Sequence, residues 1–194
     1  MKWWKVNPIP EDDRFYKIIE GFVLECPSSV KKTKKQGKGI KSRADYEPVS
    51  RRQSSFRSRG ISHNLLTTLL CQLRKNLQKK STYVCLDTSD DVLLEFNRLM
   101  KANTLKDDFF EFMLFKKRND MCEIEAIYYA IRNSFAHGSF EVIERNNKRI
   151  YLLESSKNNE IMARMRLNET TLMKYIQLSK LNVNEIKCYG KYKK

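Results

Sequence analysis

Arg132, Asn133 and His137 lie close together in the segment IRNSFAHGSFEV, which spans residues 131–142. Asn133 and His137 are four residues apart and share one face of a helix, whereas Arg132 lies about 140° from His137 around the helix axis. The length of the arginine side chain can close that gap. A guanidinium offers planar donors to phosphate oxygens, and an imidazole can accept and return a proton near neutral pH. The trio therefore predicts a site for a phosphate at the C-terminal end of a helix, where exposed carbonyl groups favour cations.

The second histidine, His63, has weaker support as a site residue. Arg57 precedes it by six residues, but Gly60 lies between them and the pair straddles the junction between a loop and a helix. No regular element fixes their relative geometry. We expect His63 to be an ordinary residue in the first turn of that helix.

The order of residues around the trio resembles a known signature. Arg132-Asn133, two further residues, Ala136, His137-Gly138 and an immediate strand are similar to the R-N-x-x-A-H-G motif of the HEPN superfamily, the higher eukaryotes and prokaryotes nucleotide-binding domains. The likeness covers most of residues 62–180 and points to the small stand-alone prokaryotic proteins of plasmid and anti-phage systems. It implies a bundle of four to five helices that forms a homodimer, in which two motifs face each other across a two-fold axis.

Many HEPN domains are endoribonucleases that need no metal, and the resemblance implies this activity here. By the same resemblance His137 is the general acid and base, Arg132 clamps the phosphate, and Asn133 positions the phosphate or the imidazole. Attack by the 2′-hydroxyl would give a 2′,3′-cyclic phosphate and a 5′-hydroxyl end. Such an enzyme would be a toxin or an abortive-infection effector against phage, with an antitoxin or defence-system partner. Ser139 stands where some toxin members carry a modified tyrosine, so the sequence does not favour that form of regulation.

Three alternatives to catalysis stay open. The trio could bind RNA or a nucleotide without cleaving it, or the chain could be a subunit held in a toxin–antitoxin complex. An Arg-Asn-His set at a helix end could also serve only to cap carbonyl groups in a structural network.

The charge of the chain points to an anionic partner. The 194 residues contain 38 Lys and Arg against 23 Asp and Glu, giving a net charge of +15 and a pI of about 9.6. Residues 30–59 alone carry a net charge of +9, with few large apolar side chains, so we expect a disordered insertion that contributes nothing to the core. It is either an inert linker or an arm that neutralises RNA phosphates. The candidate RNA-binding residues are Lys31, Lys32, Lys34, Lys35, Lys38, Lys41, Arg43, Arg51, Arg52, Arg57 and Arg59.

Apolar periodicity predicts a mainly α fold. Helices are expected over 11–26, 62–80, 89–101, 104–117 and 119–137, and a further helix starts at Asn168. A small β-hairpin or meander is expected at about 139–167, between the motif helix and the last helix. The expected architecture is thus a HEPN-like helical bundle. Its parts are an N-terminal helix (1–29), a basic insertion (30–61), the bundle (62–183) and a basic tail (184–194).

The remaining residues predict no cofactor. Five scattered cysteines and two histidines do not form zinc-binding spacing, so no metal site is expected and the thiols are expected to be reduced. Glu123 and Glu125 precede the trio and are expected to face solvent, although Glu125 is close enough to Arg132, two turns later, to form a salt bridge with it. The aromatic residues Phe109, Phe110, Phe112, Phe115, Tyr128 and Tyr129 are assigned to the core and the dimer interface. No apolar run is long enough to span a membrane and the first residues do not form a secretory signal, so we expect a cytoplasmic protein.

Overall fold

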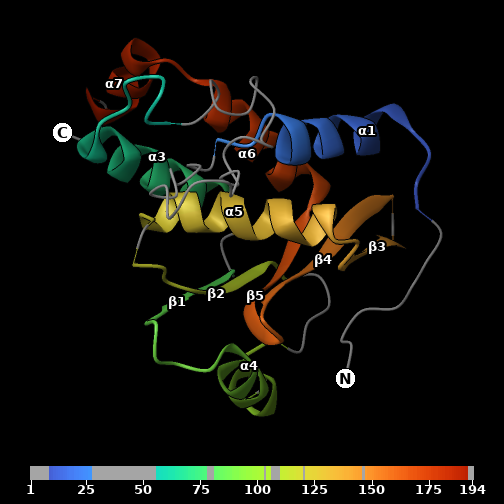
Figure 1. Cartoon of the computed structure of the whole chain (residues 1–194). Coiled ribbons are helices and arrows are strands. Elements are labelled where there is room, and N and C mark those ends of the chain that lie inside the picture. The colour runs from blue at the N-terminus through green and yellow to red at the C-terminus, as the bar shows by residue number, and fades with distance from the viewer. Residues whose placement is uncertain are drawn as a thin grey trace, which may run out of the picture.

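A five-stranded sheet with helices on both faces forms the protein, as seen in a computed structural model (Figure 1). The structure describes residues 9–27, 56–77, 81–102, 104–105, 110–119, 121–145 and 147–191. The helices are α1 (Asp13–Ile19), the π-helical turn η1 (Glu20–Leu24), α3 (His63–Asn76), α4 (Val92–Lys101), α5 (Glu123–Ala136), α6 (Glu169–Lys180) and α7 (Val183–Lys191). The strands are β1 (Thr82–Leu86), β2 (Phe112–Lys116), β3 (Phe140–Arg145), β4 (Lys148–Lys157) and β5 (Glu160–Asn168).

The sheet has the order β1-β2-β5-β4-β3. β1 and β2 are parallel, and the other neighbours are antiparallel. The expected meander over 139–167 is present as β3, β4 and β5. A register shift between Ser155 and Ser156 interrupts the pairing of β4 with β5.

The expectation of a mainly α bundle is wrong, because β1 and β2 extend the meander into a mixed sheet and the fold is α/β. The segment 112–116, expected to lie in a helix, is the strand β2, and all five of its residues are buried. A strand buried on both faces shows no apolar–polar alternation, so its pattern resembles that of a buried helix. The strand β1 was not anticipated, although Tyr83 and Val84 are typical strand residues.

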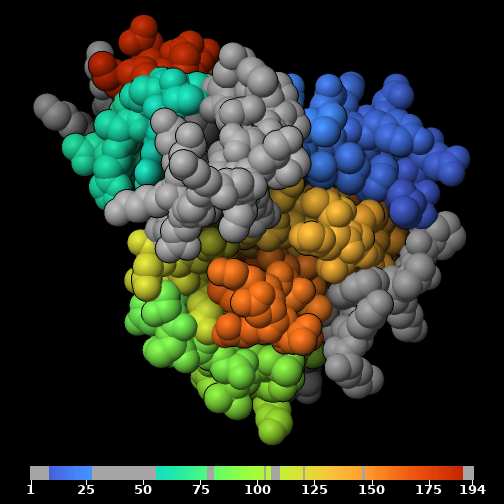
Figure 2. All heavy atoms as spheres, in the orientation of Figure 1, coloured from blue at the N-terminus to red at the C-terminus, as the bar shows by residue number. Residues whose placement is uncertain are grey.

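The helices form two unequal layers. Helix α5 lies against the sheet, with α1, α3, α6 and α7 around it on the same face, and α4 covers the other face (Figure 1). In the space-filling view the blue α1 and the teal α3 gather at one end of the molecule and the green α4 at the other (Figure 2). The other predicted helices are confirmed, with bounds that differ by a few residues.

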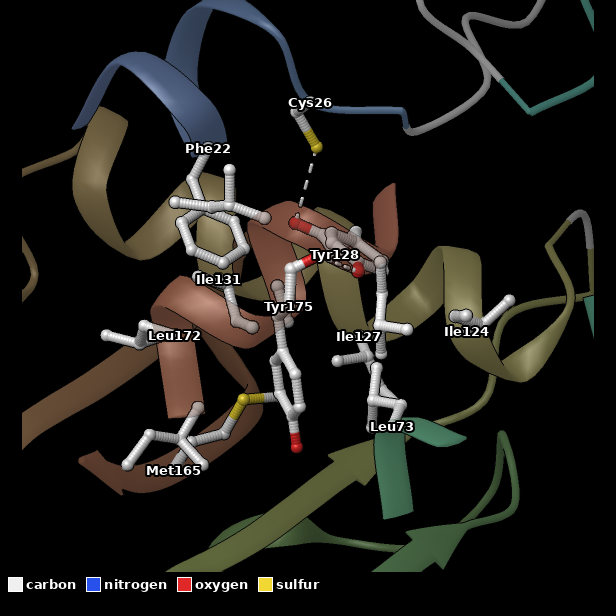
Figure 3. Close-up of a cluster of buried hydrophobic side chains, with 14 of the residues drawn as sticks. Phe22, Cys26, Leu73, Ile124, Ile127, Tyr128, Ile131, Met165, Leu172 and Tyr175 are labelled. Carbon is white, nitrogen blue, oxygen red and sulfur yellow. Dashed lines mark hydrogen bonds between the residues drawn. The ribbon is translucent and has the colours of Figure 1, made fainter. Parts of the chain in front are cut away.

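The main core lies between α5 and the helices that surround it (Figure 3). Tyr128 of α5 is fully buried, and its hydroxyl donates to the carbonyl oxygen of Tyr175 at 2.5 Å. Cys26 donates its thiol to the carbonyl oxygen of Tyr128 at 3.6 Å. Phe22 packs beside the same ring, with the ring centroids 6.0 Å apart. These contacts fix α5 along its length and so fix the position of the motif that it carries.

A buried aromatic side chain closes the end of the predicted insertion. Phe56 is fully buried, and its ring meets that of Tyr128 edge to face at a centroid distance of 5.7 Å. Its backbone N–H donates to the carbonyl oxygen of Pro27 at 3.2 Å. The expectation that residues 30–59 contribute nothing to the core is therefore wrong at Phe56. The residues between Pro27 and Phe56 lie outside the described part of the chain.

An ion-pair cluster ties the start of α1 to the hairpin of β3 and β4. Arg149 pairs with Asp12, Glu144 and Glu169, and Arg14 adds a contact to Glu169 at 3.4 Å. The hydrogen bond from Arg149, with help from the backbone N–H of the first helical turn, lowers the pKa of Asp12 to about 2. Asp12 also caps α1, so its negative charge joins two elements.

Candidate functional site

The helix α5 ends immediately after the predicted motif. His137 is the C-terminal cap, and Gly138 follows with a φ of 64°. The Ser139 N–H donates to the carbonyl oxygen of Ser134 at 2.8 Å, and the Gly138 N–H donates to that of Phe135 at 3.2 Å. This pair of bonds is a Schellman motif, which needs a left-handed residue where Gly138 stands. The predicted end of the helix at Gly138 is confirmed, and it turns the chain directly into β3.

Two members of the trio are in contact. Arg132 Nη1 donates to Asn133 Oδ1 at 3.1 Å. Asn133 is buried, Arg132 is half-buried, and His137 is exposed at the cap position. The structure therefore brings Arg132 and Asn133 together and leaves the imidazole of His137 open to solvent one turn later.

The burial of Asn133 changes its expected role. Its side chain borders a small cavity of about 10 Å³ between α5 and the sheet, which Tyr129, Ser155 and Ser156 also line. Because Asn133 faces the protein and its oxygen accepts from Arg132, it is suited to orient the guanidinium rather than to contact a phosphate. Sequence spacing indicated that Asn133 and His137 share a helix face, but it did not show that this face is covered at Asn133.

The structure describes two of the predicted RNA-binding residues, Arg57 and Arg59, and Arg57 contacts the motif helix. Arg57 lies 3.8 Å from a carboxylate oxygen of Glu125, between Nε and Oε1, with its own side chain 68% exposed. The Arg59 guanidinium lies 5.3 Å from the ring centroid of Phe56, and burial lowers its pKa. The contact of Arg57 helps to hold the turn after the insertion against α5, whereas that of Arg59 lies within the turn. The other nine predicted RNA-binding residues, Lys31, Lys32, Lys34, Lys35, Lys38, Lys41, Arg43, Arg51 and Arg52, lie outside the described residues.

Glu123 and Glu125 do not face solvent as expected. Glu125 is 1% exposed and accepts from the Cys122 N–H at 3.1 Å, which caps the start of α5. Glu123 Oε1 accepts from Arg74 Nη2 at 2.7 Å and from the Tyr83 hydroxyl at 2.8 Å. Both carboxylates therefore position α5. The spacing of Glu125 from Cys122 fits an N-terminal capping pattern and was the available signal for one of these roles.

The thiols nearest to the start of α5 are not activated. Burial raises the pKa of Cys85 to about 12 and that of Cys122 to about 11. Both remain protonated at neutral pH and are poor nucleophiles. Within the described ranges, no group of three or more His, Cys, Asp or Glu side chains could hold a metal ion. None of the described helices is long and apolar enough to cross a membrane.

Comparison with known proteins assigns the chain to no family. No protein-family model, curated protein or solved structure matches it. The geometry of Arg132, Asn133 and His137 is thus the basis on which function is argued.

Proposed function

We propose that this protein is a metal-independent endoribonuclease of the HEPN type, with Arg132 and His137 as catalytic residues and Asn133 as a positioning residue. One observation supports the proposal above the others: the contact between Arg132 and Asn133 next to an exposed His137, at a helix end locked by Gly138. A guanidinium and an imidazole placed next to each other at a protein surface can approach an RNA backbone without any rearrangement of the core.

The proposed reaction is an internal phosphoryl transfer. His137 takes the proton of a 2′-hydroxyl, whose oxygen attacks the adjacent phosphorus while the bond to the 5′-oxygen breaks. The leaving 5′-oxygen receives a proton, and the products are a 2′,3′-cyclic phosphate and a 5′-hydroxyl end. Arg132 stabilises the charge that develops on the non-bridging oxygens.

A homodimer would supply the second proton-transfer group. One imidazole must be neutral to accept the proton, whereas protonation of the leaving group needs an imidazolium. Two copies of His137 facing each other across a two-fold axis would provide both states, with both Arg132 side chains beside them. We therefore propose a composite site between two chains, in a cytoplasmic toxin or abortive-infection effector that an antitoxin or defence partner controls.

The test is cleavage of a labelled RNA by the purified chain in EDTA. His137→Ala and Arg132→Ala should each reduce the rate by about 10²–10⁴-fold, the usual contribution of a general acid or base or of a transition-state donor. Arg98→Ala is the matched control, because Arg98 lies on α4 across the sheet and pairs with Glu95 at the surface. Mass spectrometry should find 2′,3′-cyclic phosphate ends, and an RNA with a 2′-deoxy residue at the cut position should resist cleavage.

Several results would contradict the proposal. Cleavage that persists in His137→Ala would come from another site or a contaminant. Cleavage that depends on an added divalent metal would exclude the proposed chemistry. RNA binding without cleavage of any substrate would favour the non-catalytic alternative.

A further inference from the structure

A second hollow of the protein lies at the end of α5 opposite the motif. It has a volume of about 470 Å³, which falls in the range of small-molecule sites, roughly 300–1,000 Å³. Its walls come from α3, from the loops that follow β1 and β2, and from the first turn of α5. None of these walls includes Arg132, Asn133 or His137.

The position of this hollow is one that ligands favour in α/β proteins. Strands β1 and β2 are parallel, with Leu86 opposite Lys116, so both strands end at the same edge of the sheet. The Lys117 N–H donates to the carbonyl oxygen of Leu86 at 2.8 Å, which keeps the two following loops side by side. Ligands of open α/β sheets bind beyond the carboxyl ends of parallel strands. We call this hollow the strand-end pocket.

The lining of the strand-end pocket has an apolar part and a polar part. Leu66 and Leu70 of α3 and Ile124 of α5 provide apolar surface, together with Met121. Hydroxyl and amide groups of Thr67, Thr88 and Asn119 stand beside it. The rest of the polar part consists of the basic side chains Lys117 and Arg118, the carboxylates Asp87 and Glu123, and His63. A ligand with an apolar body and a polar, anionic end would match both parts.

Each of the two carboxylates that line the pocket is paired with a cation, Asp87 with Lys117 and Glu123 with Arg74. The Arg118 guanidinium lies 4.4 Å from the ring centroid of Tyr129, a residue that lines the small cavity beside Asn133 and not this pocket. Lys117 Nζ lies 3.3 Å from Asp87 Oδ1, but these side chains are 55% and 74% exposed, and such an exposed ion pair is weak. An incoming phosphate can therefore compete for Lys117. The other carboxylate of the lining, Glu123, is already compensated by its hydrogen bonds from α3 and β1.

We propose that the strand-end pocket binds a small phosphorylated ligand with a flat, weakly polar body, of the nucleoside monophosphate class. The phosphate contacts Lys117 and Arg118, and the body lies on the apolar surface of Leu66, Leu70 and Ile124. Along α5, at 1.5 Å per residue, Ile124 at the pocket lies about 12 Å from Arg132 and about 20 Å from His137. The proposal is independent of RNA cleavage, because none of the proposed catalytic residues takes part.

The test is calorimetric titration of the full chain with AMP, GMP, CMP and UMP, and with inorganic phosphate and adenosine separately. At least one monophosphate should bind more tightly than phosphate or adenosine alone. Lys117→Gln should weaken that binding about tenfold, because it removes a charge-assisted hydrogen bond. Thr67→Trp, an exposed position on the rim, should abolish it by filling the pocket. Lys101→Gln on α4, beyond the opposite face of the sheet, is the matched control and should bind as the unaltered chain does.

The outcomes separate this site from the motif. Binding that survives His137→Ala while Lys117→Gln weakens it supports the strand-end pocket, whether or not the chain cleaves RNA. Loss of binding in His137→Ala would place the ligand at the motif and overturn the proposal. So would the absence of monophosphate binding up to about 5 mM, equal affinity in Lys117→Gln and Lys101→Gln, or phosphate binding as tight as that of the nucleotide. Thermal melting of Thr67→Trp verifies that its loss of binding is not a loss of fold.

Discussion

The boundary of the basic insertion can be tested by two deletions that differ in whether Phe56 remains. In the first, residues 28–55 are replaced by a four-residue Gly-Ser linker; in the second, residues 30–59 are removed. The Phe56 N–H donates to the carbonyl oxygen of Pro27 at 3.2 Å, so a short turn can join these positions without moving either. A shorter connection also costs less closure entropy. The first variant should therefore unfold with a free energy within about 1 kcal/mol of that of the full chain.

The second deletion removes a core residue. Phe56 is 0% exposed and packs on Tyr128. Truncation of a buried Phe to Ala typically costs about 3–5 kcal/mol. Loss of Arg57 also leaves the buried Glu125 without its ion-pair partner at 3.8 Å, a smaller cost because Arg57 is mostly exposed. Against a total stability of about 5–15 kcal/mol, the removal of 30–59 should lower the free energy of unfolding by at least about 3 kcal/mol.

Urea unfolding followed by circular dichroism measures both effects. Phe56→Ala in the full chain should reproduce most of the loss in the second deletion, which separates the role of the side chain from that of loop length. Tyr16→Ala is the aromatic control, because Tyr16 is 55% exposed. Equal stability of the two deletions, or a cost below about 1 kcal/mol for Phe56→Ala, would refute the assignment of Phe56 to the core.

Three further substitutions test other parts of the fold. Gly138→Ala should lower the free energy of unfolding by about 1–2 kcal/mol because φ at this residue is 64°, and Gly138→Asn should lower it less. Equal melting temperatures of the unaltered chain and both variants would contradict the Schellman motif at the end of α5. Gly21→Ala would place a Cβ 2.6 Å from Cδ1 of Ile176. The packing cost of about 1–3 kcal/mol should exceed the gain in helix propensity of about 1 kcal/mol, so urea unfolding should show a lower free energy of unfolding. The pKa of Asp12 is lowered to about 2 by Arg149, so its contribution to stability is full above about pH 4 and is lost as the pH falls through 2. Asp12→Asn keeps the cap but should flatten the dependence of unfolding free energy on pH in that window, and an unchanged slope would contradict this ion pair.

The parts of the fold that the sequence predicted are those set by local patterns. The amphipathic period of α5, its stop at Gly138 and the polar turn between β3 and β4 are each contained in a short segment. β2 was missed because Phe112–Lys116 is buried on both faces and shows no alternation. β1 was missed because the main evidence for it is its pairing with β2. The helix α4 separates these strands in the sequence, so no local pattern of residues indicates the pairing.

The features of the candidate site likewise fall into those that local sequence patterns predicted and those that depend on distant contacts. Arg132, Asn133 and His137 could be selected because they are neighbours in the chain and helix geometry relates them. The burial of Asn133 depends on the bulge of β4 at Ser155, and the burial of Glu125 depends on the docking of the turn at Phe56. Both are contacts between segments far apart in the sequence, so periodicity could not reveal them.

The burial of the aromatic residues also restricts how a composite site could form. Phe112, Phe115 and Tyr128 are each 1% exposed within one chain. They therefore cannot serve the dimer interface for which this aromatic set was also considered. Two chains that share a site must instead meet through exposed groups near His137, at the C-terminal end of α5.

The dipole of α5 affects the two proposed anion sites in opposite ways. At the strand-end pocket a phosphate lies near the positive end of the helix, where the dipole favours it. At the motif a phosphate approaches the negative end of the helix dipole, which opposes it by about 0.3–1 kcal/mol. Arg132 must offset that cost before it contributes any binding. A dimer strengthens this requirement, because two helix C-termini would then face the same phosphate. The contact of Asn133 with the Arg132 guanidinium is consistent with this need, since an oriented cation loses less entropy when it binds.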